Sequence, residues 1–451
     1  MSGDKEFKDL PEGWKWVRLE EVTESKKFSI VDGPFGTQLH ADEYIEDGEI
    51  PVVRVINLSF EGKLIEKDLV FISQQKAKQL SRSKVVPGDI IIAKTGATIG
   101  KCGVFPKSFL EGIIASSCMK VSIDKTKANN LFLLFWLVSR HGQNAIINSA
   151  LGTTRTTINI SPFKNLKIPL PPLPEQQKIA EILETIDNAI EKTDKIIEKY
   201  KRIKQGLMQD LLTKGIDENG NIRNEKTHKF KDSPLGRIPE EWEVVRLGEV
   251  ALNITDGKHG DCQDEENSGY YFISAKDVYD GNIDYEKARQ ITKKDFEEAH
   301  KRTLLEPEDI VLTNSGTIGK IAVVKEIPET FRTTFQKSVA IIKLNRETSV
   351  PNFIAQELRS LVKKLINESY GSAQQNLLLR DLRKMFIPLP PHPEQQRIAE
   401  ILTQIDQTIE KEQQYKEKLQ KIKQGLMQDL LTGKVRVNKL LEVENNELPR
   451  T

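Results

Sequence analysis

The sequence has little cysteine and no long apolar run, and each absence excludes a class of protein. Its three cysteines, Cys102, Cys118 and Cys262, are odd in number and never spaced as Cys-x-x-Cys. This argues against a disulfide framework or a zinc site. The longest apolar run, 131–138, is far shorter than the roughly 18 to 20 residues that span a membrane. The chain begins Met-Ser-Gly-Asp-Lys-Glu, without the apolar core of a signal peptide. We therefore expect a cytoplasmic protein with no membrane association.

An excess of charge of one sign is also missing. The 67 Lys and Arg residues nearly balance the 66 Asp and Glu residues in a chain of 451 residues, for a net charge of +1. Residues 1–165 hold 22 basic against 19 acidic side chains, and residues 228–386 hold 24 against 26. This balance does not exclude nucleic acid as a partner, because local clusters of Lys and Arg determine the affinity for phosphates. If residues 228–386 bind DNA, we expect either that their positive charge is gathered on one face or that this domain binds weakly on its own.

Catalytic motifs are absent as well. The segment TGATIGK resembles a phosphate-binding loop, but that loop needs four residues between Gly and Gly-Lys, then Ser or Thr. Only three residues lie between Gly96 and Gly100, and the related segment near residue 316 has two. There is no glycine-rich cofactor fingerprint after a strand and no His-x-x-x-His pair, and the pair of His259 and Cys262 is more often incidental than a site. We predict a non-catalytic chain that binds no metal or cofactor.

The dominant feature of the sequence is an internal repeat. IPLPPLPEQQKIAEIL (168–183) recurs as IPLPPHPEQQRIAEIL (387–402), and IKQGLMQDLLT (203–213) recurs unchanged at 422–432. Both blocks are offset by 219 residues, so no residue was inserted or deleted between them. Upstream, PEGWKWVRLEEV (11–22) is loosely repeated as PEEWEVVRLGEV (239–250). The chain therefore consists of a variable domain followed by a fixed helix, and this arrangement occurs twice.

Each fixed block has the pattern of a long helix. From Glu175, apolar residues recur at steps of three and four, which is typical of a coiled-coil seam. The seam predicted for the first copy is Ile179, Ile182, Ile186, Ala189, Ile196, Tyr200, Ile203 and Leu207; that of the second is Ile398, Ile401, Ile405, Tyr415, Leu419, Ile422 and Leu426. Pro174 and Pro393 suit the first helical position. We expect one continuous helix from Glu175 to Leu212 and a second that matches it.

Four glutamines of the first helix recur in the second at positions that we expect to be exposed. They are Gln176, Gln177, Gln205 and Gln209, repeated as Gln395, Gln396, Gln424 and Gln428. A purely structural helix would explain the pattern on composition alone. Packing, however, could be kept by many sequences, so the repetition suggests that one surface is presented to two copies of one partner.

The variable domains have a mixed pattern of helix and strand. Short β-branched runs at 50–56, 89–93, 270–274 and 339–344 predict strands. A helix is expected before each fixed block, at 131–147 and 352–367. The predicted domains are 1–165, a helical region 166–215, a second domain 216–385 with a linker at 216–231, a second helical region 386–435 and a tail 436–451. We expect an α/β (α+β) fold with two domains separated by two helices packed as an antiparallel coiled coil with pseudo-two-fold symmetry.

These motifs resemble one protein family. SPLGRIPEEWEVVRLGEV (233–250), the paired IPLPPxPEQQ(K/R)IAEIL blocks and the paired KQGLMQDLLT ends are similar to the specificity subunit of type I restriction-modification systems. Segments 32–58 and 254–260 resemble the openings of target-recognition domains in that family. The first copy departs from the pattern, because it lacks the PLGRI that precedes the Pro-Glu-x-Trp motif of the second.

The resemblance implies a DNA-binding subunit without catalytic activity. Each target-recognition domain would read one half of an interrupted, asymmetric site in double-stranded DNA. The helices would set the gap and dock two methyltransferase subunits that carry S-adenosylmethionine. A motor/endonuclease subunit, with ATP and Mg, would join for cleavage.

Candidate DNA contacts are polar or basic residues on loops, where Arg can pair with guanine and Gln with adenine. LGTTRTT (151–157) aligns with YGSAQQN (370–376) at offset 219, which places Arg155 opposite Gln374. A solvated or capping loop residue is an equally good reading. Lys101 and Lys320 recur in both copies, so they are candidates for phosphate anchors or structural residues. Arg380, Arg383 and Lys384 form a basic patch, or a solvated helix face.

Two other functions remain open at this point. One is an interaction scaffold in which the coiled coil joins two ligand-binding domains without a role in DNA binding. The other is a specificity subunit of a related system, in which methylation and cleavage share one partner polypeptide. DNA affinity that falls steeply with salt would separate recognition from the scaffold.

Overall fold

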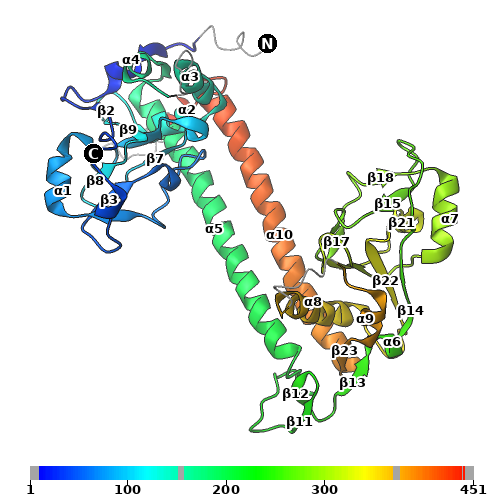
Figure 1. Ribbon diagram of the computed structural model, residues 1–451. Helices are drawn as coiled ribbons and strands as arrows, with labels where there is room; N and C mark the ends of the chain where they lie inside the picture. Colours follow the sequence, from blue (N-terminus) through cyan, green and yellow to red (C-terminus); the bar gives the residue numbers. More distant parts are fainter. Residues whose placement is uncertain (1–9, 151–156, 369–375, 439, 442–451) are drawn as a thin grey trace, which may run out of the picture. The chain divides into compact units, whose positions relative to one another are not determined.

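The computed structural model describes residues 10–150, 157–368, 376–438 and 440–441. The chain forms two compact units: unit 1 consists of residues 1–194 and 414–451, and unit 2 of residues 195–413. Each unit contains one variable domain and about half of each of two long helices (Figure 1).

The domain of unit 1 is built on two sheets of four strands. The first has the order β2 (Ile30–Asp32), β9 (Cys118–Val121), β6 (Ile90–Ala93) and β7 (Cys102–Val104), all antiparallel. The second has the order β4 (Val70–Ile72), β3 (Ile50–Val53), β8 (Gly112–Ile114) and β5 (Lys84–Val85), with β3 and β8 parallel. All four residues of β3 and all four of β6 are buried. Their runs are therefore continuously apolar instead of alternating.

Two helices follow these sheets where the sequence pattern predicts one over 131–147. They are α2 (Asn130–Val138) and α3 (Arg140–Ala150), and the chain breaks between them at Ser139. Ser139 has extended backbone angles, and its hydroxyl accepts a hydrogen bond of 3.2 Å from the Gly142 N–H. A Cβ atom at Gly142 would lie 2.0 Å from the Trp136 carbonyl oxygen, so only glycine allows this close turn. The apolar pattern alone does not reveal such a break.

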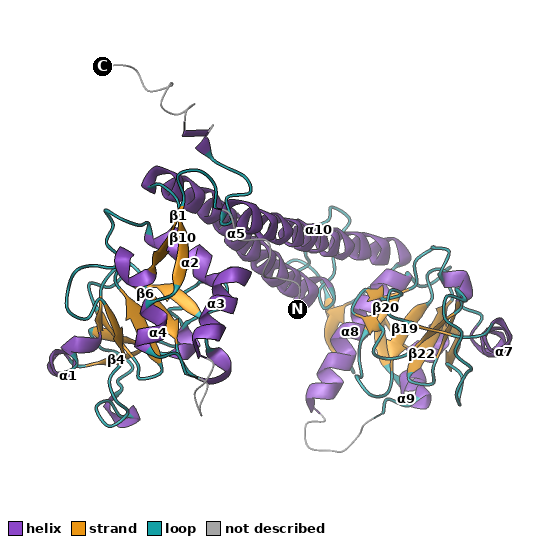
Figure 2. Cartoon of the chain, turned by 90° about the horizontal axis from the view of Figure 1, so that it is seen from above, coloured by secondary structure: helices purple, strands orange, loops and turns teal. Residues whose placement is uncertain are grey.

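The domain of unit 2 repeats this plan. The antiparallel sheet has the order β14 (Ala251–Asp256), β22 (Val339–Leu344), β19 (Ile310–Thr313) and β20 (Ile321–Val323). A second sheet joins β18 (Arg289–Gln290), β15 (Tyr271–Ile273) and β21 (Thr333–Phe335), and β15 and β21 are parallel as β3 and β8 are. Helix α7 (Lys293–Thr303) follows β18 and precedes β19 in the sequence. The single helix α8 (Pro351–Glu368) takes the place of α2 and α3. Helices and strands are mixed in both units (Figure 2), which confirms the predicted α+β class.

Smaller elements complete the two units. Unit 1 has α1 (Gln74–Gln79) and α4 (Ile160–Lys164). Unit 2 has the hairpin of β11 (Phe230–Ser233) and β12 (Gly236–Pro239), the hairpin of β16 (Val278–Tyr279) and β17 (Asn282–Ile283), and the helices α6 (Leu247–Val250) and α9 (Leu379–Lys384).

A two-stranded pair closes each domain. In unit 1, β1 (Lys15–Arg18) pairs antiparallel with β10 (Lys167–Leu170), and in unit 2, β13 (Glu243–Arg246) pairs in the same way with β23 (Phe386–Leu389). The repeated Pro-Glu-x-Trp motifs lead into β1 and β13, and the repeated IPLPP segments form β10 and β23. The chain therefore returns to the start of each domain immediately before a long helix.

The long helices are α5 (Leu173–Leu211) and α10 (His392–Leu430), each of 39 residues, as the unchanged offset of the repeat predicts. In unit 1, the Lys423 ammonium lies 2.6 Å from the Asp187 carboxylate. In unit 2, Lys204 makes the equivalent bond to Asp406, also at 2.6 Å. Each pair joins the first half of one helix to the second half of the other, so the helices are antiparallel within each unit.

The buried stripe of the helices differs in part from the predicted seam. Ile179 and Ile398 are buried as expected. In the middle of α5, Ile190, Thr193 and Ile197 are buried instead, at 3 to 8% exposure, whereas Ile196 and Ile203 are 39% exposed. In α10, Tyr415 and Ile422 are likewise 53% and 41% exposed. These four predicted seam positions are wrong, because steps of three and four fit two neighbouring faces of one helix and only the packing partner selects between them.

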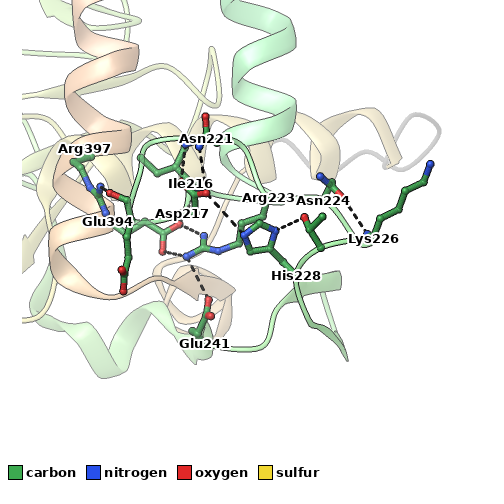
Figure 3. A network of polar contacts seen from close by, with 12 residues as sticks. Ile216, Asp217, Asn221, Arg223, Asn224, Lys226, His228, Glu241, Glu394 and Arg397 are labelled. Atoms are coloured by element: carbon green, nitrogen blue, oxygen red, sulfur yellow. Dashed lines mark hydrogen bonds and ion pairs between the residues drawn. The ribbon is translucent and has the colours of Figure 1, made fainter.

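A buried ion pair fastens α10 in unit 2. The Glu394 carboxylate, at the start of α10, accepts hydrogen bonds from the Arg223 guanidinium (2.5 and 3.1 Å), the Trp242 indole (3.2 Å) and the Ile216 backbone N–H (2.9 Å). Figure 3 shows Arg223 between Glu394 and Glu241, whose carboxylate lies 3.3 Å from the guanidinium. Arg223 belongs to the segment expected to be a linker, 216–231, but it is only 8% exposed.

Unit 1 contains the same arrangement. Glu175, at the start of α5, accepts bonds from Arg436 (2.7 and 2.9 Å) and from the Trp14 indole (3.0 Å). A Cβ atom at Gly433 would lie 2.4 Å from the Pro11 ring, so the turn that follows α10 requires glycine at this position. In each unit the Trp of the Pro-Glu-x-Trp motif and the Glu of the PEQQ block are thus bonded to each other, which explains why both are repeated.

Candidate nucleic-acid interface

Three loops converge at one end of the antiparallel sheet in unit 2. The Gly257 N–H, in the loop after β14, donates to the Val339 carbonyl at the start of β22, 3.2 Å. The segment that precedes α9 is held to the turn after β19 by the hydrogen bond from the Leu377 N–H to the Asn314 carbonyl, 2.7 Å. Asn314 itself donates to the Ser338 carbonyl beside β22 at 3.0 Å. Loops held by a sheet in this way are the usual place for binding residues.

Unit 1 builds the same loop cluster with equivalent bonds. The Gly33 N–H donates to the Cys118 carbonyl, the Lys94 N–H to the Ser117 carbonyl, and the Ile158 N–H to the Lys94 carbonyl, each at 2.9 Å. The Lys94 ammonium also lies 3.1 Å from the Asp32 carboxylate and so joins the first loop to the second. Segments distant in sequence therefore meet at one place in each domain.

The Asp-Gly turn that opens each cluster is seated tightly on the sheet. A Cβ atom at Gly33 would lie 2.0 Å from the Ala115 carbonyl oxygen, and one at Gly257 would lie 2.0 Å from the Phe335 carbonyl oxygen. Neither position has room for a larger residue. Beyond the glycine the two units differ: Phe35 is 68% exposed, whereas the corresponding His259 has a 59% exposed side chain that contacts Asp256 at 3.0 Å. The two loop clusters therefore share a backbone framework but expose different side chains.

The predicted phosphate anchors each lie over an aromatic ring. The Lys101 ammonium is 5.6 Å from the centre of the Phe60 ring, and the Lys320 ammonium is 5.3 Å from that of Tyr279. Both rings are exposed, at 45% and 47%. The aromatic partners were missed in the sequence, although SFEGK and VYDGN both place an aromatic residue two positions before a glycine. A lysine held against an aromatic ring in both units suits contact with a nucleic-acid strand.

The other predicted DNA contacts are distributed differently. Arg155 and Gln374 lie outside the described residues. The Arg383 guanidinium donates to the Ile254 carbonyl of β14, so this side chain packs on the sheet. Arg380, with a 74% exposed side chain, lies 3.7 Å from Asp381, and Lys384 is exposed. All three residues of the basic patch on α9 are therefore exposed, and one of them also bonds to the sheet.

Two of the eight predicted partner-binding glutamines are not on the surface. Gln176 and Gln395 are completely buried, which corrects the expectation that these positions are exposed. The Gln176 side chain accepts from the Asn129 N–H (2.8 Å) and donates to the Pro171 carbonyl (2.8 Å). Gln395 makes the equivalent bonds to Val350 (2.9 Å) and Pro390 (2.9 Å). Their repetition is explained by backbone groups that need a partner inside the protein.

The remaining six glutamines are exposed, together with apolar residues that the seam prediction had buried. In α5, Ile203 (39% exposed) lies next to Gln205 and Gly206 in sequence, and in α10, Ile422 (41% exposed) lies next to Gln424 and Gly425. No other residue comes within 4 Å of where a Cβ atom would lie on either glycine. Each helix therefore presents the same accessible surface, with apolar and amide groups.

Neither a metal centre nor a membrane span emerges from the part of the chain that the structure describes. No group of three or more His, Cys, Asp or Glu side chains there could hold a metal ion. No described helix is both long and apolar enough to cross a membrane. The buried thiols are not prepared for chemistry, because burial raises the pKa of Cys118 to about 12.

Comparisons with known proteins agree with this architecture. The family model "Type I restriction modification DNA specificity domain" matches residues 11–201 and 239–421. The type I restriction enzyme MjaVIII specificity subunit of Methanocaldococcus jannaschii is 32% identical over 361 residues, which cover 78% of this chain and 80% of that protein. The EcoBI specificity subunit of Escherichia coli is 28% identical over 298 residues, 63% of this chain and 60% of that one.

The fold also matches solved structures. The specificity subunit of a type I system from M. genitalium has a TM-score of 0.59 at 18% identity, with 94% of this chain and 97% of that chain covered. A chain from a type I restriction-modification system, solved in a study of complex assembly, has a TM-score of 0.54 at 20% identity, with 95% and 100% covered. The two matched regions, one in each half of the chain, show that this protein belongs to the type I restriction-modification DNA specificity family, whose members recognise DNA without catalysing a reaction.

Proposed function

We propose that this chain reads a two-part, asymmetric site in double-stranded DNA, with one half recognised by the variable domain of each unit. The loop clusters carry the proposal. Both are held by equivalent backbone bonds, yet they present different side chains, with Phe35 in unit 1 and His259 in unit 2. Different side chains on one scaffold contact different base edges, so the two half-sites would differ in sequence.

The helices would fix the gap between the half-sites and dock two methyltransferase subunits. The duplicated exposed surface around Ile203 and Ile422 supports two copies of one partner. S-adenosylmethionine would be bound by those subunits, and ATP and Mg by a motor/endonuclease subunit that joins them. The complex would act in the cytoplasm, where its DNA substrate is.

Mapping of methylated adenines tests this function directly. The chain is co-expressed with the methyltransferase of its own system, and modified bases are located across the host genome. We expect one two-part motif with a fixed gap. Exchange of residues 17–164 for the corresponding domain of a relative should change one half of the motif and leave the other unchanged.

Helix length offers a second test of the same function. One heptad inserted at matched positions of α5 and α10 adds about 10 Å to each helix. At about 3.4 Å per base pair, the gap should then grow by roughly three base pairs while both half-sites stay the same.

A soluble complex that methylates no motif would instead support a scaffold without DNA recognition. A partner that methylates and cleaves in one polypeptide would identify the related fused system.

A further inference from the structure

Unit 2 contains a groove that shares only Lys320 with the candidate nucleic-acid interface. It has a volume of about 950 Å³ and lies between the second half of α5, helix α8, strand β12 and the turn Ile318–Lys320. Its apolar lining residues are Met208, Leu212, Leu235, Ile238, Leu361 and Pro388. Gln205 and Gln209 of α5, two of the exposed glutamines, form part of its wall.

The charged residues that line this groove are mostly basic. Seven cationic side chains line it, against the two acidic residues Asp280 and Glu357; the cations are Lys201, Lys204, Arg237, Lys320, Arg359, Lys363 and Lys364. Lys204 is paired with Asp406 and Arg237 with Glu225. Lys201 and Lys363 are exposed, and no acidic group among the described residues lies within ion-pair distance of either. The domain 228–386, whose overall charge is slightly negative, thus contributes positive charge to one place.

Unit 1 does not share all of these charges. Offset 219 places Gln420 opposite Lys201. The glutamine bonds set Val350 opposite Asn129, and at that offset Val138, the last residue of α2, lies opposite Arg359. At least two of the seven cations are therefore replaced by uncharged residues at the matching positions of unit 1.

Glu357 makes the groove unusual. It is 3% exposed, and its Oε1 atom has no hydrogen-bond partner. Burial raises its pKa well above the usual range, because the surrounding protein disfavours the charged carboxylate. The corresponding residue of unit 1 is Trp136, whose buried indole Nε1 atom likewise has no hydrogen-bond partner. The two units therefore differ here in the acidity of the buried group and not in whether it is paired.

We propose that the groove of unit 2 is a docking site for an acidic, partly apolar segment of the methyltransferase partner. The inference rests on the proposed function, which supplies that partner. The lysines of the groove attract carboxylates, while its apolar lining and the two glutamines suit the side chains and backbone of a polypeptide. A nucleic-acid backbone offers charge but little apolar surface to cover the apolar lining, so the observations favour a protein.

Charge reversal tests the proposal. In the full chain, Lys201→Glu with Lys363→Glu should weaken binding of the purified methyltransferase subunit at least about tenfold at low salt, and the difference should shrink at high salt. Binding is followed by calorimetry, and native mass spectrometry reports how many methyltransferase copies remain bound. The matched control, Lys287→Glu with Lys301→Glu, changes the same charge on exposed lysines of unit 2 away from the groove. It should bind like the unaltered chain.

The outcomes separate this inference from the proposed function. Unchanged methyltransferase binding by the groove variant, beside normal folding by circular dichroism, overturns the groove proposal and leaves DNA recognition intact. If the variant instead loses affinity for duplex DNA alone, the groove is a nucleic-acid surface and the proposal is also wrong. If the unaltered chain binds no methyltransferase, the docking part of the proposed function fails and the groove proposal fails with it. A complex that assembles normally but methylates no motif refutes DNA recognition only.

Discussion

Removal of Arg223 should loosen unit 2 at one defined place. The Glu394 carboxylate is 3% exposed and accepts four hydrogen bonds, two of them from Arg223. In Arg223→Met the carboxylate stays buried, with only Trp242 and the Ile216 N–H as donors. Breaking a buried ion pair from one side costs about 3–5 kcal/mol. A loss of about 3 kcal/mol corresponds to roughly a hundredfold larger population of the open state.

Hydrogen exchange measures this loss where it occurs. Backbone amides at the start of α10 and in residues 216–223 should exchange roughly a hundredfold faster in Arg223→Met, whereas unit 1 serves as an internal reference. Adding Glu394→Gln should restore most of the protection, because the remaining carbonyl oxygen still accepts from its neighbours and no charge is left buried. The exposed Arg237, paired with Glu225 at 3.3 Å, supplies the control: Arg237→Met should cost less than about 1 kcal/mol.

Two results would refute the reasoning. One is an unchanged exchange rate in Arg223→Met, which would mean that the ion pair contributes nothing. The other is an equal increase in both units, which would mean that the variant destabilises the chain globally. Arg436→Met in unit 1 should show a smaller effect, on the order of 1–3 kcal/mol, because the Arg436 side chain is 26% exposed and water can replace part of its bonds.

Three further predictions concern the buried Glu357, the buried thiols and the ion pair of Lys204 with Asp406. Glu357→Gln should raise the melting temperature at pH 7; a carboxyl whose pKa is raised in the folded state stabilises the fold fully only below about pH 4.5 and loses that contribution as the pH rises, so the gain should vanish near that pH. A gain of equal size at both pH values would contradict this account. Cys102 and Cys118 are buried with raised pKa values, so a thiol reagent should modify them only after denaturation, and rapid reaction in the native protein would show that the core opens. Lys204→Met should cost about 0.5–1 kcal/mol, and exchange of Lys204 with Asp406 should recover it; no recovery would mean that packing and not charge is involved.

Local patterns predicted the repeated helices well. A helix from Glu175 to Leu212 was predicted from a proline, a periodic apolar pattern and an offset that tolerates no insertion, and the observed helix, Leu173–Leu211, agrees to within two residues at each end. The strand over 339–344 is reproduced without change, and helix α8 to within one residue at each end. These features depend on neighbours in sequence, so the sequence contains them directly.

Contacts between distant residues were decided only by the tertiary structure. A repeated glutamine such as Gln176 could face solvent or the interior, and only the Asn129 backbone beside it made it a buried residue. The partner of Glu175 is Arg436, 261 residues later, and no periodicity links the two. Packing likewise chose Ile197 over Ile196 for the helix interface.

The sequence by itself determined that this protein contains two copies of one arrangement, a variable domain followed by a long helix, because nearly identical blocks recur at a constant offset. The tertiary structure decided which of the repeated residues are buried and which are exposed, and it revealed a groove in unit 2 that is lined by seven cationic side chains. The physical reason is that helix formation is local, whereas burial and electrostatic surroundings are properties of the assembled fold.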